Sequence, residues 1–85
     1  MANIIKNYPM ELEPDMNRLV ETYGDGLLRL CLLYLKDMHL AEDALQDTFL
    51  QVYRHYHSFQ GQAAEKTWIT RIAINVCKNY LRKPW

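Results

Sequence analysis

Apolar side chains recur at intervals of three and four residues through most of this chain, which is the spacing of one face of an α-helix. Three stretches carry the pattern, beginning near Pro14 or Asp15, at residue 41 and at residue 67. Proline and an early acid suit the start of a helix, and Pro84 ends the last one. No stretch qualifies as a strand. The pattern therefore predicts an all-α fold, a compact bundle of three to four helices.

The number of helices depends on the segment Gly24-Asp25-Gly26, which interrupts the first stretch. Either the helix kinks there, or a new helix begins with Asp25 as its N-terminal cap. Residues 27–36 then continue as an apolar helix that we expect to be buried on nearly every side. We expect one domain over residues 1–85, with residues 1–11 flexible.

The helix over residues 41–57 shows the clearest pattern. Its inner face consists of Ala41, Ala44, Leu45, Thr48, Phe49, Val52 and Tyr56, and its outer arc of Asp43, Gln46, Asp47, Leu50 and Arg54. Leu50 stands in the middle of the outer arc, with no core to join. A single exposed leucine is common on a solvated face, but an apolar residue with a polar rim also fits the centre of a small partner-binding patch. The residues leave both interpretations open.

The last helix, from about residue 67 to 83, has a basic stripe opposite its apolar arc. The stripe consists of Arg71, Asn75, Lys78 and Arg82, and no acid occurs from residue 66 to 85. Cations spaced by one helical turn can contact successive phosphates, and an asparagine among them can hydrogen-bond a base edge. The alternative is a set of cations that only keeps the surface soluble.

A loop over residues 58–66 precedes this helix, and Gly61 permits unusual backbone angles within it. The loop and its neighbourhood supply aromatic rings for stacking and amides for reading an unpaired base. These candidates are Phe59, Gln60, Gln62 and Trp68. Phe59 and Trp68 can instead belong to the core, and the position of Trp68 on the apolar arc favours core packing for that residue.

The net charge of zero hides a division of charge along the chain. Residues 1–50 hold four basic and nine acidic side chains, whereas residues 51–85 hold six basic and one acidic. We expect two surfaces of opposite charge, of which the basic one is a candidate for binding a polyanion.

The sequence gives little support for a membrane-spanning helix, a metal site or a catalytic site. Cys31 and Cys77 lie in apolar stretches and indicate buried, reduced thiols, although spacing alone leaves a disulfide between them open. The most apolar run, residues 27–35, is far shorter than the ~20 residues of a membrane-spanning helix, and the absence of a signal peptide favours the cytoplasm. No metal site or catalytic set can be assembled from His39, His55 and His57. We therefore expect no enzymatic activity, cofactor or metal.

Two motifs in the chain are similar to those of a known family. The segments AEDALQDTFLQVYRHYHSFQG and TWITRIAINVCKNYLRK resemble the second conserved region of bacterial sigma factors of the extracytoplasmic-function (ECF) type, over about residues 20–83. The family pattern is A-E-D-x-x-Q-[DE]-x-F, then F-x-G, then T-W-[LI]-x-x-I-A-x-N. The resemblance implies the fold of sigma region 2 and a role in transcription initiation.

The same resemblance implies partners and site residues. In that family the helix matching residues 41–57 docks on the clamp helices of the largest catalytic subunit of RNA polymerase core, which assigns Asp43, Gln46, Asp47, Leu50 and Arg54 to polymerase binding. The loop accepts a base flipped out of the minus-ten promoter element, and the last helix lies along the single-stranded non-template strand. The implied DNA-binding residues are Phe59, Gln60, Gln62, Lys66, Arg71, Asn75, Lys78 and Arg82. An anti-sigma factor is a further expected partner, with Ile74 and Leu81 as its contact.

The chain departs from the family pattern in three places. Asn79 stands where many relatives carry an acid, and the alanine- and glutamine-rich loop leaves the captured base undefined. The chain also stops at residue 85, before the domain that reads the minus-thirty-five element, so we expect an isolated or trimmed domain that binds promoter DNA weakly on its own. The rival interpretation is a sigma-like decoy that binds an anti-sigma factor without touching DNA, but a decoy has no need of the basic stripe.

Overall fold

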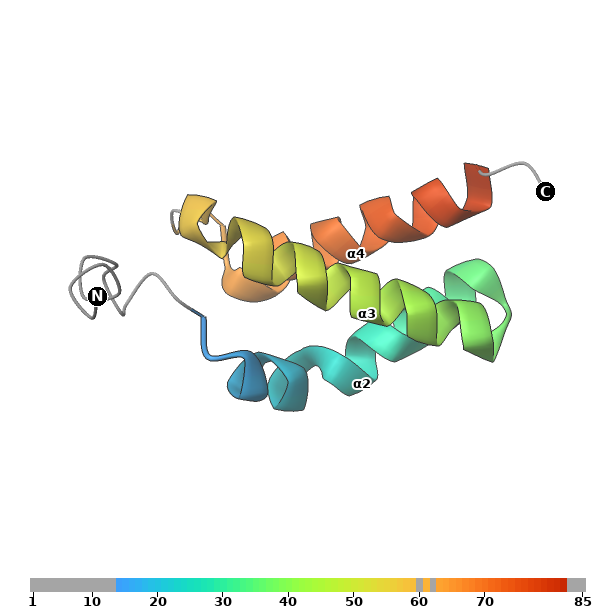
Figure 1. Cartoon of the computed structure of the whole chain (residues 1–85), viewed down its shortest axis with the longest axis horizontal. Coiled ribbons are helices and arrows are strands. Elements are labelled where there is room, and N and C mark those ends of the chain that lie inside the picture. The colour runs from blue at the N-terminus through green and yellow to red at the C-terminus, as the bar shows by residue number, and fades with distance from the viewer. Residues whose placement is uncertain (1–13, 60, 62, 83–85) are drawn as a thin grey trace, which may run out of the picture.

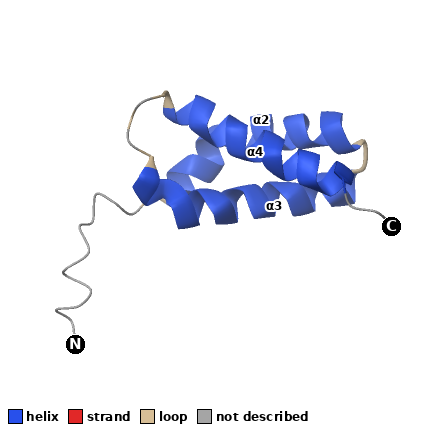
Figure 2. Cartoon of the chain, turned by 90° about the horizontal axis from the view of Figure 1, so that it is seen from above, coloured by secondary structure: helices blue, strands red, loops and turns tan. Residues whose placement is uncertain are grey.

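The computed structural model describes residues 14–59, 61 and 63–82. Its elements, in order, are α2 (Met16–Leu35), α3 (Met38–His55), the short 3-10 helix η2 (Tyr56–Ser58) and α4 (Glu65–Arg82). Each of the three α-helices packs against the other two, and all three run along the long axis of the molecule (Figure 1, Figure 2). The expected all-α bundle is confirmed for the described part of the chain. Residues 1–11, which we expect to be flexible, lie outside the described residues.

Helix α2 begins where the sequence predicts. The side chain of Asp15 caps it by accepting a hydrogen bond of 3.2 Å from the backbone N–H of Arg18. The helix then continues without a break through Gly24 and Gly26, so the alternative of a new helix capped by Asp25 is wrong. Neither glycine adopts a positive φ, and Leu19 and Leu27 hold the helix to the core on both sides of the pair. Burial on both sides thus outweighs the low helix propensity of two glycines.

The second half of α2 is less buried than its composition predicts. Leu27 and Cys31 are buried, but Leu33 is 74% exposed. A helix with two neighbours in a three-helix bundle keeps one sector in contact with solvent, whatever residues occupy it. The expectation that residues 27–36 are buried on nearly every side is therefore wrong for Leu33.

Two residues connect α2 to α3. Lys36 adopts a left-handed backbone conformation with φ of 57°, and its N–H donates to the carbonyl oxygen of Leu32 at 2.8 Å. The next residue, Asp37, caps α3 by accepting from the N–H of Leu40 at 3.0 Å. Such a short connection between two capped helix ends makes α2 and α3 an antiparallel hairpin.

The core is built from all three helices. One cluster of buried residues consists of Leu19, Leu27, Val52, Ile69 and Ala73, and a second of Cys31, Ala41, Ala44, Val76 and Cys77. Thr48, the one buried polar side chain in the described part, donates to the carbonyl oxygen of Ala44 at 2.7 Å, which satisfies its hydroxyl. The predicted inner face of the helix over residues 41–57 is confirmed, since each of its residues is buried or half-buried, although Tyr56 belongs to η2 and not to α3.

Helix α4 is rich in β-branched residues, yet it is a regular helix of 18 residues. Ile69, Ala73 and Val76 bury one face of it, and this tertiary packing outweighs its low intrinsic propensity. The helix begins at Glu65, two residues earlier than the spacing predicts, so Lys66 belongs to its first turn and not to the loop. Gly61, with φ of 72°, lies in the loop as predicted.

Candidate functional site

The outer face of α3 is exposed as predicted. Asp43, Gln46, Asp47, Leu50 and Arg54 all face solvent, and Leu50 is 47% exposed. Helix geometry alone puts them on one face, because they lie three or four residues apart. The α3 face, meaning these five residues, therefore offers an apolar centre with an acidic and amide rim.

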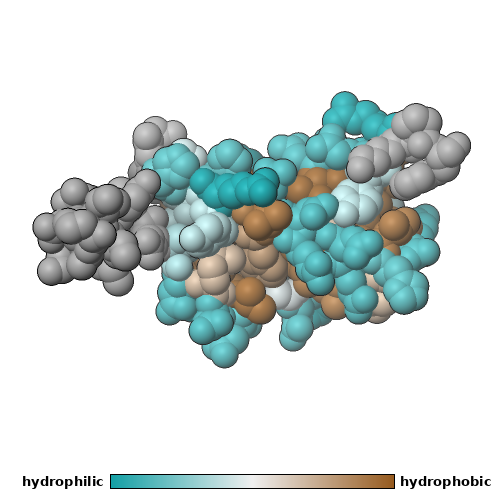
Figure 3. Space-filling view, viewed as in Figure 1, coloured by the Kyte–Doolittle hydropathy of each residue, from teal (hydrophilic) through white to brown (hydrophobic). Residues whose placement is uncertain are grey.

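Leu50 has apolar neighbours that the sequence pattern does not predict. A hollow of about 480 Å³ between α2 and α3 runs beside it. The residues that line the hollow are Met16, Val20, Leu45, Gln46, Phe49, Leu50 and Tyr53. Val20 is 47% exposed and Tyr53 is 58% exposed, so apolar surface reaches solvent on the face that carries α3, as Figure 3 shows. The sequence does contain one sign of this apolar surface, because Tyr53 lies one helical turn after Leu50.

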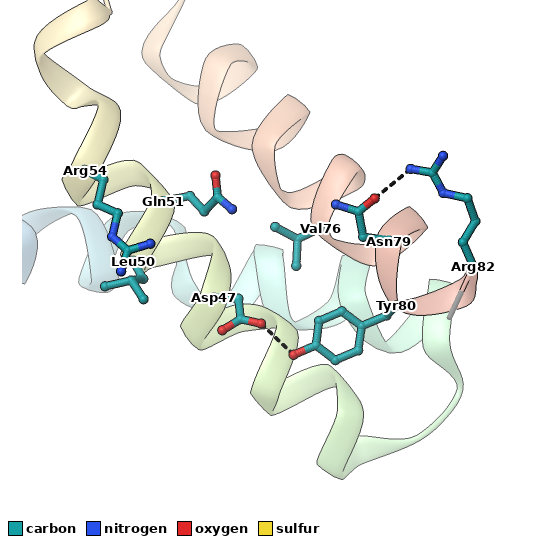
Figure 4. Close-up of a pocket in the computed structure, with 8 residues that line it drawn as sticks. All are labelled: Asp47, Leu50, Gln51, Arg54, Val76, Asn79, Tyr80 and Arg82. Carbon is teal, nitrogen blue, oxygen red and sulfur yellow. Dashed lines mark hydrogen bonds between the residues drawn. The ribbon is translucent and has the colours of Figure 1, made fainter. Parts of the chain in front are cut away.

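Asp47 is held by a residue of the next helix. The hydroxyl of Tyr80, on α4, donates to Oδ2 of Asp47 at 2.6 Å (Figure 4). Burial and, second, this hydrogen bond raise the pKa of Tyr80, so the phenol stays protonated and keeps donating. The pair lies in a cleft of about 510 Å³ between α3 and α4. The hydrogen bond thus holds the side chain of Asp47 in a fixed orientation on the α3 face.

The basic stripe of α4 faces solvent. Arg71, Asn75, Lys78 and Arg82 are all exposed. Among the residues that the structure describes, the single ion pair joins Arg18 to Glu65, so no carboxylate neutralises the stripe there. The guanidinium of Arg82 donates to Oδ1 of Asn79 at 2.6 Å, but that partner is neutral and leaves the positive charge uncompensated.

The loop residues divide between packing and surface. Phe59 is half-buried in an aromatic cluster with Tyr56 and Trp68, with ring centroids 5.0 to 5.7 Å apart. Trp68 packs against the core, as its position on the apolar arc predicts. The structure therefore gives Phe59 a packing role, with only part of its surface open to a ligand. Lys66 is exposed, whereas Gln60 and Gln62 lie outside the described residues.

Glu65 is a site residue that the sequence did not single out. Its carboxylate accepts two hydrogen bonds from the guanidinium of Arg18, at 3.1 and 2.8 Å. It also accepts from the hydroxyls of Tyr23 at 2.9 Å and Tyr56 at 2.7 Å. Arg18 is the main reason why the pKa of Glu65 falls to about 2, and the two phenols add to it. The carboxylate joins α2, η2 and α4, and so ties together both ends of the loop.

The remaining titratable groups form no reactive constellation in the described part of the chain. No group of three or more potential metal ligands occurs among those residues, and His39, His55 and His57 are exposed. Cys31 and Cys77 are free thiols and fully buried, which agrees with the expectation of reduced cysteines. None of the helices described is long and apolar enough to pass through a bilayer.

Comparison with known proteins shows the family of the chain. The family model for sigma-70 region 2 matches residues 19–85. The chain is 35% identical over 72 residues to the ECF RNA polymerase sigma factor SigX of Bacillus subtilis, covering 85% of this chain and 37% of that protein. It is 38% identical over 65 residues to the ECF RNA polymerase sigma-E factor of Haemophilus influenzae, covering 76% of this chain and 34% of that protein. No solved structure gave a match.

The chain spans between about a fifth and two-fifths of the length of the curated relatives it matches. Sigma factors are transcription regulators rather than enzymes. The matched residues include all of α3 and α4, which carry both exposed surfaces. The chain therefore belongs to the sigma-70 region 2 family and is the region 2 domain of an ECF-type sigma factor.

Proposed function

We propose that this domain acts in transcription initiation in the cytoplasm, where it docks on RNA polymerase core and binds the single-stranded non-template strand of the minus-ten promoter element. The observation that carries the proposal is the basic stripe of α4, which is exposed and uncompensated by any acid in the described part of the chain. Uncompensated cations at one-turn spacing suit a strand of phosphates.

The α3 face is the proposed polymerase contact. Its partner is the pair of clamp helices of the largest catalytic subunit. Leu50 and the adjacent apolar hollow supply surface to bury, and Asp43, Gln46 and Asp47 supply a rim that binds donors and cations. Tyr80 supports this contact by fixing the orientation of Asp47, so less conformational entropy is lost when the partner binds.

The loop and α4 are the proposed DNA contact. Arg71, Lys78 and Arg82 bind phosphates, and Asn75 hydrogen-bonds a base or backbone oxygen. The loop captures one base out of the stack, with Gln60 and Gln62 as readers of its edge. Unstacking costs a few kcal/mol, which the contacts must offset. The Glu65 carboxylate supports this role because it holds both ends of the loop in place before the strand arrives.

The DNA arm of the test measures binding of labelled single-stranded minus-ten oligonucleotides over a salt series. We expect affinity to fall steeply with salt, and Arg71→Ala and Lys78→Ala each to lower the slope by about one. Lys36→Ala is the matched control, since Lys36 is an exposed cation in the connection between α2 and α3 and does not belong to the stripe, so its removal should leave the slope unchanged. No binding at low salt would contradict the DNA role and favour the decoy.

The polymerase arm measures retention of the chain by the isolated clamp region. Leu50→Asp and Asp47→Arg should abolish retention without loss of helicity. Leu33→Asp is the matched control, because Leu33 is a more exposed leucine on α2, outside the α3 face. Normal retention of the Leu50→Asp variant would contradict the assignment of the α3 face to polymerase binding.

An anti-sigma factor is the third proposed partner. Leu81 is 57% exposed and Ile74 is half-buried, so apolar surface lies beside the basic stripe. A partner that covers Leu81 would block the strand from α4 and thereby silence the domain. The decoy interpretation would use the same surface but gives no reason for the cations next to it.

A further inference from the structure

Arg82 differs from the other two cations of the basic stripe. Nη2 of its guanidinium donates to Oδ1 of Asn79 at 2.6 Å (Figure 4). The side chains of Arg71 and Lys78, in contrast, form no hydrogen bond or ion pair with any residue that the structure describes. One cation of the stripe is therefore given a direction by its own helix, whereas the other two extend into solvent.

The place of Arg82 in α4 explains how this bond forms. Arg82 is the last residue of the helix, and Asn79 precedes it by three residues. Long helical side chains lean back over the preceding turn, so the side chains of residues three apart can meet. Lys78 lies four residues before Arg82, and like charges at that spacing repel each other. Without Asn79, this repulsion and the many rotamers of arginine would favour conformations in which the guanidinium leaves the stripe.

The partner of Arg82 is neutral, which decides what the bond does to the charge. A carboxylate in the place of Asn79 would also orient Arg82, but its negative charge would oppose the positive one. The amide oxygen instead accepts from one N–H group of the guanidinium and leaves the others, and the full charge, for another acceptor. An arginine can bind a phosphate with two parallel N–H groups. Asn79 therefore orients the guanidinium without consuming its capacity for a phosphate.

No carboxylate pairs with Arg82 in the described part of the chain. Asp47 and Arg82 line the same cleft between α3 and α4. Asp47, however, is bonded to the hydroxyl of Tyr80 at 2.6 Å, as Figure 4 shows. The single ion pair among the described residues joins Arg18 to Glu65. The oriented guanidinium therefore remains available to a ligand that approaches from solvent.

We infer that Asn79 is a positioning residue for promoter DNA: it holds the guanidinium of Arg82 in line with the basic stripe, where a phosphate of the non-template strand binds. This inference rests on the proposed function and adds to it a residue that acts through Arg82 and not through the strand. The physical effect is preorganisation, because an arginine that is already oriented loses less conformational entropy when the phosphate arrives. Since the bond keeps the charge, Asn79 changes affinity through orientation and not through the number of charges.

The test measures binding of labelled single-stranded minus-ten oligonucleotides to the 85-residue chain over a salt series. Asn79→Asp keeps an acceptor at this position but places a negative charge beside Arg82, so the salt slope should fall by about one, as it should for Arg82→Ala. Asn79→Ala removes the acceptor and keeps every cation of the stripe, so the slope should stay unchanged while affinity falls about threefold. Circular dichroism checks the fold of each variant.

Double variants show whether Asn79 acts through Arg82. In the Arg82→Ala background Asn79→Asp should lower the slope no further, whereas with Arg71→Ala the two losses should add to about two. Gln51→Glu is the matched control, because this change adds the same charge to the same cleft without a bond to Arg82, and its slope should stay close to that of the wild type.

Three results would overturn the inference alone: Asn79→Asp keeps the wild-type slope, Asn79→Asp lowers the slope equally when Arg82 is absent, or Asn79→Ala binds like the wild type. If the wild type shows no salt-dependent binding, the proposed function fails as well.

Discussion

At the scale of residues, the side chain of Glu65 connects three elements of the described part of the molecule. One carboxylate receives the guanidinium of Arg18 and the hydroxyls of Tyr23 and Tyr56. It is 18% exposed, so these bonds are only partly screened by water. The bonds cross from α4 to α2 and to η2, and they fix the ends of the loop that is proposed to capture a base.

Replacement of Glu65 by Gln should weaken the fold in a way that depends on pH. We expect a loss of about 1–3 kcal/mol of unfolding free energy at pH 7, because charge-assisted hydrogen bonds are lost. The folded pKa, about 2, lies below the usual value of 4.5, so the contribution is present above about pH 4.5 and disappears as pH falls toward 2. Urea unfolding between pH 7 and pH 2.5 measures this: the wild type should lose its advantage over Glu65→Gln across the acid range.

Glu42→Gln is the control for that experiment, since Glu42 is an exposed acid on α3. A variant of Glu65 that tracks the Glu42 variant at every pH would contradict the structural role.

The sequence predicts the members of the two surfaces but not the contacts that position them. Leu50 and the basic stripe follow from spacing along one helix, which is a local property. The partners of Glu65, in contrast, lie 47 residues away for Arg18 and 42 for Tyr23, and no periodicity connects them. The bond between Tyr80 and Asp47 spans 33 residues and escapes prediction for the same reason. Contacts between helices depend on the packing angles and register, which a single helix pattern does not contain.

At the scale of elements, the sequence pattern predicts which helices form but places several of their limits wrongly. Spacing predicts the existence and faces of the helices correctly, because hydrophobic periodicity dominates in long segments. It errs at Gly24 and Gly26, where tertiary packing keeps α2 continuous. It also errs at the start of α3, which begins at Met38 with Asp37 as its cap and not at residue 41, and at the start of α4, where Glu65 lies in the first turn and bonds to other elements. At the two glycines and at the start of α4, local propensity is outweighed by burial or by a distant hydrogen bond.

The end of α2 offers a direct test of backbone strain. Lys36 holds φ of 57°, where a side chain is unfavourable by roughly 1–2 kcal/mol relative to glycine. Lys36→Gly should therefore raise the unfolding free energy by about 0.5–1 kcal/mol, the gain being reduced by the greater freedom of glycine in the unfolded chain. Urea unfolding measures it. Lys36→Ala, which removes the charge but keeps a Cβ, should show no such gain, and equal gains for both variants would refute the strain argument.

At the scale of the whole molecule, the three helices expose chemically different surfaces while sharing one core. The α3 face carries two aspartates around Leu50, and the basic stripe of α4 carries three cations. Cys31 of α2 and Cys77 of α4 meet in the core, beside Ala41 and Ala44 of α3. A small domain with all helices in mutual contact is expected to unfold as one unit, so both surfaces depend on the same core.

The buried thiols report on that cooperativity. Burial raises the pKa of Cys31 to about 12 and also raises that of Cys77, so neither forms the reactive thiolate in the folded state. With an unfolding free energy of about 5 kcal/mol, labelling of the native chain by iodoacetamide should be about a thousandfold or more slower than that of the unfolded chain. Mass spectrometry of the two peptides should show equal rates at Cys31 and Cys77 as urea is added. Faster labelling of one thiol without urea would mean that its helix opens alone, and the surface on that helix would then be mobile independently of the core.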